Sequence, residues 1–117
     1  MLTDYEKLLD EVNAATDPAS AAQQILNTHM FSVTAFTTTN GAGTLKVQVS
    51  NDPTPVNRPG SVDSGSWVDL SGATATLTSA GSGIINVTAS PWRWMRVVWT
   101  HTGSGGTITA HFNGKGV

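Results

Sequence analysis

The stretch from Ser90 to Phe112 constrains the fold of this 117-residue chain more than any other segment. Residues 94–101 can alternate between the two faces of a strand, and both faces are largely apolar, as in a central strand covered on both sides. The glycine-rich run at 103–106 suits a tight turn, and residues 107–112 alternate again. The pattern predicts two long strands joined by a hairpin, and therefore a β fold.

Further segments between residues 31 and 90 show the same alternation. They are Ser32–Thr37, Leu45–Val49, Trp67–Leu70, Ala73–Leu77 and Ile85–Ala89. Short strands at regular spacing, separated by turn residues, are typical of a β-sandwich. Residues 51–66 contain three prolines and two glycines, and we expect them to form a long loop of the kind that often carries function. We expect Trp67 and Trp99 to lie in the core, because each tryptophan buries a large apolar area.

Residues 1–28 differ from the rest of the chain in charge and in periodicity. This segment holds five acids and one base, whereas residues 29–117 hold three acids and five bases. Asp17-Pro18 is a typical start for a short helix that reaches about residue 26. Before it, apolar side chains recur at helical intervals, namely Tyr5, Leu8, Leu9 and Val12. We therefore expect residues 1–28 to form a helical arm, packed on its own sandwich or docked on a neighbour, and residues 29–117 to form the sandwich.

Composition and charge argue against several classes of protein. The chain has no cysteine, which excludes disulfides and thiolate metal sites. A net charge of −2 with scattered basic residues argues against a nucleic-acid partner. No apolar run approaches the roughly 20 residues of a membrane span, and the acidic N-terminal segment does not resemble a signal peptide. We therefore expect a protein made in a cytoplasm that stays there or leaves by lysis.

Catalytic and metal-binding residues are sparse. The carboxylates of the β part, Asp52, Asp63 and Asp69, are expected to make local turn hydrogen bonds. The three histidines, His29, His101 and His111, lack the spacing of a metal site. Asn51, Asp52 and Asp63 could offer oxygens to calcium, which needs six to eight of them. We expect neither an enzyme nor a cofactor.

Three short motifs occur in a distinctive order along the chain. Val49-Ser50-Asn51-Asp52 ends a strand, the sequence WVDLSG follows at 67–72, and the sequence SPWRWMRVVW follows at 90–99, before a glycine-rich turn and a last strand. This order resembles the galactose-binding-like, or discoidin-type, jelly roll, in the shorter form found in small structural proteins of tailed bacteriophages. The resemblance covers about residues 31–116 and implies an antiparallel jelly-roll β-sandwich. Two features depart from it: tryptophans stand where tyrosines are usual, and the loop at 53–66 is expanded.

The resemblance, with the small self-contained fold, leads us to expect a bacteriophage virion structural protein. The most specific form of this expectation is a capsid decoration (cement) protein that bridges capsid subunits and contacts the major capsid protein or another virion protein. As a dimer or trimer it would use an interface that includes Tyr5, Leu8, Leu9, Val12 and Trp92. The alternative is a carbohydrate-binding module of a tail or baseplate, which attaches to the host surface and stacks sugars on Trp92 and Trp94.

Overall fold

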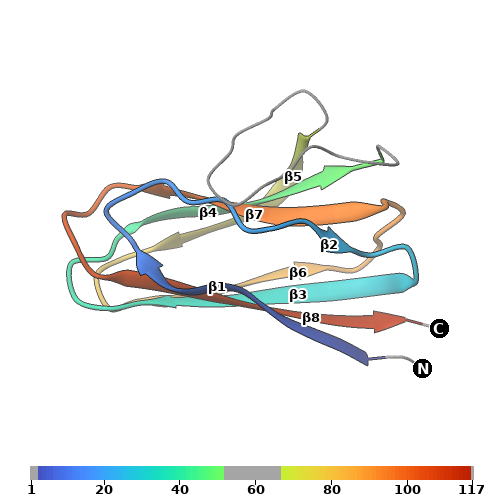
Figure 1. Cartoon of the computed structure of the whole chain (residues 1–117), viewed down its shortest axis with the longest axis horizontal. Helices are drawn as coiled ribbons and strands as arrows, with labels where there is room; N and C mark the ends of the chain where they lie inside the picture. The colour runs from blue at the N-terminus through green and yellow to red at the C-terminus, as the bar shows by residue number, and fades with distance from the viewer. Residues whose placement is uncertain (1–2, 52–66, 117) are drawn as a thin grey trace.

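The chain folds as a sandwich of two antiparallel sheets, with no helix in the part that the structure describes (Figure 1). The computed structural model describes residues 3–51 and 67–116. The strands are β1 (Thr3–Asn13), β2 (Gln23–Gln24), β3 (Thr28–Thr37), β4 (Gly43–Ser50), β5 (Val68–Leu77), β6 (Ser82–Val87), β7 (Trp94–His101) and β8 (Thr107–Gly116). Sheet A has the strand order β1-β8-β3-β6, and sheet B has the order β2-β7-β4-β5. The predicted mainly β sandwich is confirmed.

The strands pair in a nested order. The first strand pairs with the eighth, the second with the seventh, the third with the sixth and the fourth with the fifth. Each of these pairs is antiparallel, and successive pairs alternate between sheet A and sheet B. This nesting is the strand order of a jelly roll. Residues 52–66 of the loop predicted at 51–66 lie outside the described residues, and with them Asp52 and Asp63, so the calcium ligands that these two could supply are not described.

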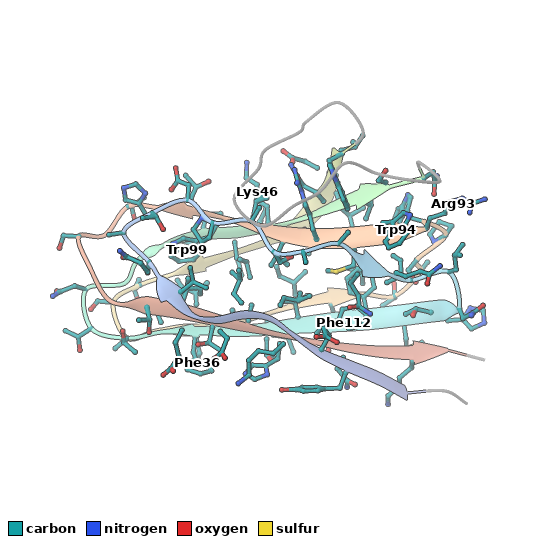
Figure 2. All side chains as sticks on the ribbon, in the orientation of Figure 1. Phe36, Lys46, Arg93, Trp94, Trp99 and Phe112 are labelled. Atoms are coloured by element: carbon teal, nitrogen blue, oxygen red, sulfur yellow. The ribbon has the colours of Figure 1, made fainter. Side chains whose placement is uncertain are left out.

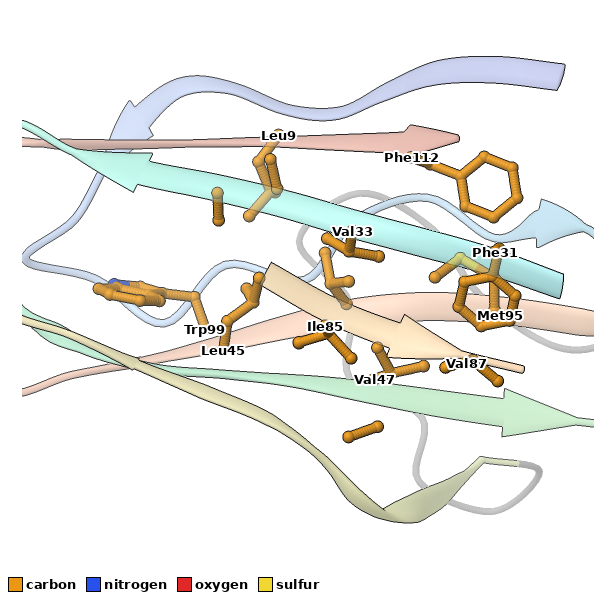
Figure 3. Close-up of a cluster of buried hydrophobic side chains, with 14 of the residues drawn as sticks. Leu9, Phe31, Val33, Leu45, Val47, Ile85, Val87, Met95, Trp99 and Phe112 are labelled. Carbon is orange, nitrogen blue, oxygen red and sulfur yellow. The ribbon is translucent and has the colours of Figure 1, made fainter. Parts of the chain in front are cut away.

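The core lies between the two sheets and follows from strand alternation. On β3, Phe31, Val33 and Ala35 are buried, whereas Thr34 and Phe36 are exposed on the other side of the strand. Figure 2 shows Trp99 and Phe112 between the layers and Phe36 outside them. The labelled core side chains of Figure 3 are Leu9, Phe31, Val33, Leu45, Val47, Ile85, Val87, Met95, Trp99 and Phe112.

Both tryptophans that were expected in the core are buried, but only Trp99 belongs to the core between the sheets, whereas Trp67 packs against Arg96. Trp99 is 1% exposed, and its indole N–H donates a hydrogen bond of 3.1 Å to the buried carbonyl of Ala14. Trp67 is 5% exposed, and its ring lies 4.6 Å from the guanidinium of Arg96. Arg96 Nε in turn donates a hydrogen bond of 2.7 Å to Gln48 Oε1. The outer face of β7 is therefore covered as predicted, but the side chain buried there is the charged Arg96 of β7 itself, held against the ring of Trp67.

The predicted N-terminal helix is wrong, because residues 3–13 form strand β1 at the edge of sheet A. Leu9 pairs with Ala110, and Val12 pairs with Ile108. The interval is three residues on β1 but two on β8, because a bulge interrupts β1 and Glu11 adopts a φ of +49°. An extra residue in a strand gives inward-facing side chains a helix-like spacing, and this explains the misleading periodicity.

The second predicted helix is also wrong, because residues 17–25 run without helical structure beside β7. The Ser20 N–H donates to the Val97 carbonyl at 2.9 Å, and the Trp99 N–H donates to the Pro18 carbonyl at 2.9 Å. Proline has no N–H, yet its carbonyl still satisfies a donor of the strand beside it. The edge of β7 therefore provides hydrogen bonds that compete with a local helix.

The glycine-rich turn at 103–106 connects the two sheets, and the predicted hairpin is wrong. β7 belongs to sheet B and β8 to sheet A, so the two strands do not pair. The turn instead packs on the loop at 40–42: the Gly105 N–H donates to the Asn40 carbonyl at 3.2 Å. A Cβ on Gly103 would lie 2.3 Å from that same carbonyl oxygen. The glycines thus permit close packing of two loops at the end of the sandwich.

Candidate functional site

The outer face of sheet A carries the candidate functional site. Strand register arranges its side chains in cross-strand rows that run over the four strands. Two of these rows, a middle row and one nearer the chain termini, cross all of β1, β8, β3 and β6. The middle row consists of Lys7, His111, Thr34 and Ile84, and the row nearer the chain termini consists of Tyr5, Asn113, Ser32 and Asn86. Side chains directly opposite each other on paired strands lie about 5 Å apart at Cβ, so each row forms a continuous surface.

Aromatic and apolar side chains gather on this face. Tyr5 is 58% exposed, Phe36 is 46% exposed and Ile84 is 57% exposed. The half-buried His111 ring lies between the two aromatic residues, with ring centroids 5.7 Å from Tyr5 and 6.2 Å from Phe36. The Tyr5 hydroxyl also contacts His111 Nδ1. We call Tyr5, Phe36, Ile84 and His111 the aromatic patch; large apolar groups gathered on a surface in this way mark interaction sites.

A groove adjoins the aromatic patch at the end of the face near the termini. It encloses about 370 Å³, within the range of small-molecule sites. Both polar and apolar residues line the groove, namely Met30, Phe31, Ser32, Asn86, Val87, Thr88, Asn113 and Lys115. Tyr5 pairs with Asn113, so the aromatic patch and the groove are neighbours on one surface.

A second hollow lies beside the groove and brings Trp92 close to it. This hollow encloses about 270 Å³ and is lined by Trp92 and Leu70, among others. Asn86 and Thr88 line both the hollow and the groove. The Asn86 amide, near the end of β6, and the Thr88 hydroxyl, just after it, therefore border both the groove and the hollow.

The residues assigned to binding from the sequence occupy different environments. Leu9 is buried in the core, and Leu8, Val12 and Trp92 are half-buried against it. Trp94 is half-buried, whereas Tyr5 is largely exposed and lies in the aromatic patch. Their roles in a partner interface or in sugar stacking stay predictions.

Other members of the site were not identified from the sequence. Phe36 and Ile84 occupy polar-side positions of alternating strands, and an apolar residue there is a signal that the sequence does contain. Asn113 and Asn86 gave no such signal, because exposed asparagines are common and only the strand register places them on either side of Ser32.

A hydrogen-bonded pair elsewhere, Asp17 and His101, has a structural role. Asp17 Oδ1 accepts hydrogen bonds from the His101 backbone N–H at 2.9 Å and from His101 Nδ1 at 2.6 Å. These bonds, the backbone one first, lower the pKa of the Asp17 carboxyl. They fix the segment after β1 against the end of β7, and both side chains are exposed.

Within residues 3–51 and 67–116, no group of three histidine, cysteine, aspartate or glutamate residues could hold a metal ion. That same part of the chain contains no helix long and apolar enough to cross a membrane.

Comparison with known proteins shows the fold alone. No family model matches the chain, and no curated protein matches its sequence. The structure of PirA is similar at 11% identity, over 95% of this chain and 92% of that chain, with a TM-score of 0.57. The SPBc2 prophage-derived protein YomS is similar at 6% identity, over 97% of this chain and 95% of that chain, with a TM-score of 0.58. The chain thus has the fold of a small β-sandwich, and no comparison of sequences supports the discoidin type in particular.

Proposed function

We propose that the protein is a structural protein of a bacteriophage particle, and more specifically a capsid decoration protein that docks on a neighbouring virion subunit. The observation that carries this proposal is the aromatic patch on the outer face of sheet A. Contiguous apolar patches on a protein surface often mark sites where a partner binds. In this proposal the protein acts as a dimer or trimer in the virion and has no catalytic activity.

The chemistry of the patch suits a protein partner. The cores of protein interfaces are enriched in aromatic residues and depleted in charge. The middle row of the outer face has one charged residue, Lys7, whose ammonium lies 3.5 Å from Asp10 Oδ1 on its own strand. The exposed parts of Tyr5 and Phe36 amount to about 100 Å² each, so their burial would contribute at most about 2.5 kcal/mol each before the entropic cost of association. Many copies on one shell would add these modest contributions.

The experiment compares docking of variants on virions. Particles that lack the protein are incubated with the purified chain, and bound protein is measured by co-sedimentation. Phe36→Ser combined with Ile84→Ser should weaken binding at least about tenfold, since it removes two apolar contacts. Val68→Ser is the matched control, because Val68 is 65% exposed but lies on sheet B. Absence of the protein from purified virions, or equal binding of the double variant and the control, would contradict the proposal.

The second candidate is a carbohydrate-binding module for attachment to a host surface, in a tail or baseplate. The observation that favours it is the amide-lined groove next to exposed aromatic rings, with Trp92 in the adjoining hollow. Glycan binding by the isolated protein separates the two candidates, because the docking proposal does not require it.

A further inference from the structure

We propose that the groove on sheet A binds a saccharide unit with an acidic substituent. The proposal deepens the second candidate function and is independent of docking through the aromatic patch. It differs from the sugar stacking on Trp92 and Trp94 expected from the sequence, because it places the site on β3, β6 and β8. Its basis is the arrangement of the groove side chains, their free hydrogen-bonding groups and the single charge on its rim.

Strand register sets the arrangement of the polar side chains. Ser32 pairs with Asn86 on one side and with Asn113 on the other, so a hydroxyl lies between two amides. Neighbouring Cβ atoms in such a row are about 5 Å apart, and the row therefore spans about 10 Å. This span matches one sugar ring with its substituents. Met30 pairs with Lys115 at the end of the groove nearer the termini.

The amides are available for a ligand. Asn86 and Asn113 are exposed, and their side chains make no hydrogen bond to any residue in the described ranges 3–51 and 67–116. Each amide can donate two hydrogen bonds and accept at its oxygen, and the Ser32 hydroxyl can do both. Adjacent hydroxyls of a sugar also donate and accept, so they can pair with this row. Met30 is 47% exposed and offers an apolar contact to the C–H face of the ring.

The rim of the groove carries one charge, the exposed ammonium of Lys115, and no carboxylate is present among the described residues that line the groove. A neutral sugar would gain hydrogen bonds from the amides alone. A sugar carboxylate placed next to Lys115 would gain a charge-assisted hydrogen bond as well, and such bonds are stronger than neutral ones. The groove should therefore prefer a uronic acid to the neutral sugar of the same ring geometry.

The test is a titration of the full chain observed by ¹H–¹⁵N NMR, in which the side-chain NH₂ groups of Asn86 and Asn113 report directly on the site. The probes are two matched pairs, methyl glucoside with methyl glucuronide and methyl galactoside with methyl galacturonide. Millimolar sugar should shift both amide signals, and the acidic member of at least one pair should bind at least about threefold more tightly. Lys115→Gln should remove this preference and leave neutral affinity unchanged.

Three variants complete the experiment. Asn86→Ala and Asn113→Ala should each lower affinity about fivefold or more, because each removes hydrogen bonds to the ligand. Asn27→Ala, which removes an exposed amide in a turn outside the groove, is the control and should bind as the unmodified chain does. The backbone signals of each variant verify its fold. The proposal is overturned if no probe shifts the groove amides, or if both asparagine variants keep full affinity. Neither result bears on docking to virions.

Discussion

Replacement of Trp99 by phenylalanine should destabilise the sandwich strongly, although the change is conservative in hydrophobicity. Trp99 is 1% exposed, and its indole N–H satisfies the carbonyl of Ala14, a residue that is itself fully buried. Phenylalanine leaves that carbonyl without a donor, which costs about 1–3 kcal/mol. The smaller ring also leaves a cavity, which adds roughly 1 kcal/mol. We expect a total of about 2–4 kcal/mol, a large part of the roughly 5–15 kcal/mol that stabilises a typical domain.

The measurement is urea unfolding followed by far-UV circular dichroism, which does not depend on the fluorescence of the removed tryptophan. Trp94→Phe is the matched control on the same strand, because Trp94 is half-buried and no hydrogen bond of its indole N–H to the described residues is found. It should cost less than about 1 kcal/mol, as substitutions of partly exposed residues usually do. If Trp99→Phe cost no more than the control, the hydrogen bond to Ala14 would not be a significant source of stability.

Three further predictions concern other parts of the fold. The Asp17 carboxyl has a pKa below its ordinary value of 3.8, so its contribution to stability is present above pH 3.8 and is lost as the pH falls through the lower pKa of the folded state. The Tm of the unmodified chain should therefore exceed that of Asp17→Asn by less and less in a series from pH 6 to pH 2. A constant difference in Tm would be inconsistent with this linkage. Gly43→Ala should cost about 1–3 kcal/mol in urea unfolding, because its Cβ would lie 2.3 Å from the carbonyl oxygen of Thr100, whereas Gly105→Ala, with its nearest atom at 3.7 Å, should cost much less. In the saccharide titration, Trp92→Ala should weaken disaccharides but not monosaccharides, since Trp92 lines the adjoining hollow and not the groove; equal loss for both would place the tryptophan in the primary site.

Strand positions could be predicted from the sequence because alternation is a local property. Residues 45–49 lie within β4, residues 73–77 lie within β5 and residues 107–112 lie within β8. In each case one side chain in two faces the core, and the pattern requires no knowledge of the partner strand. The burial of Trp67 and Trp99 followed from side-chain size in the same way.

The prediction failed where non-local pairing overrides a local signal. Leu9 and Val12 have the spacing of a helix face, but a bulge against β8 produces the same spacing in a strand. The glycines at 103–106 permit a sharp reversal, yet the sequence does not say whether the next strand joins the same sheet or the opposite one. Both decisions depend on strands that lie far away in the chain.

The candidate site was only partly accessible from the sequence for the same reason. Tyr5 was assigned to a binding surface as part of a helix, and it lies on an exposed surface as part of a strand. Asn86 and Asn113 are 27 positions apart in the sequence (113 − 86) and come to lie in one row only because β3 pairs with both β6 and β8. No spacing rule within one segment could have placed them on either side of Ser32.

The nested strand order has a consequence for how the chain reaches its folded state. Strand β1 pairs with β8, so Tyr5 must find Asn113 at almost the other end of the sequence. Folds dominated by such distant contacts fold slowly, on a scale of milliseconds to seconds. In sheet A, β8 lies between β1 and β3. Until β8 leaves the ribosome during synthesis, the edges of β1 and β3 that pair with it stay open to other chains. A stop codon shortly before residue 107 should therefore yield an aggregating product, even though seven of the eight strands would be present.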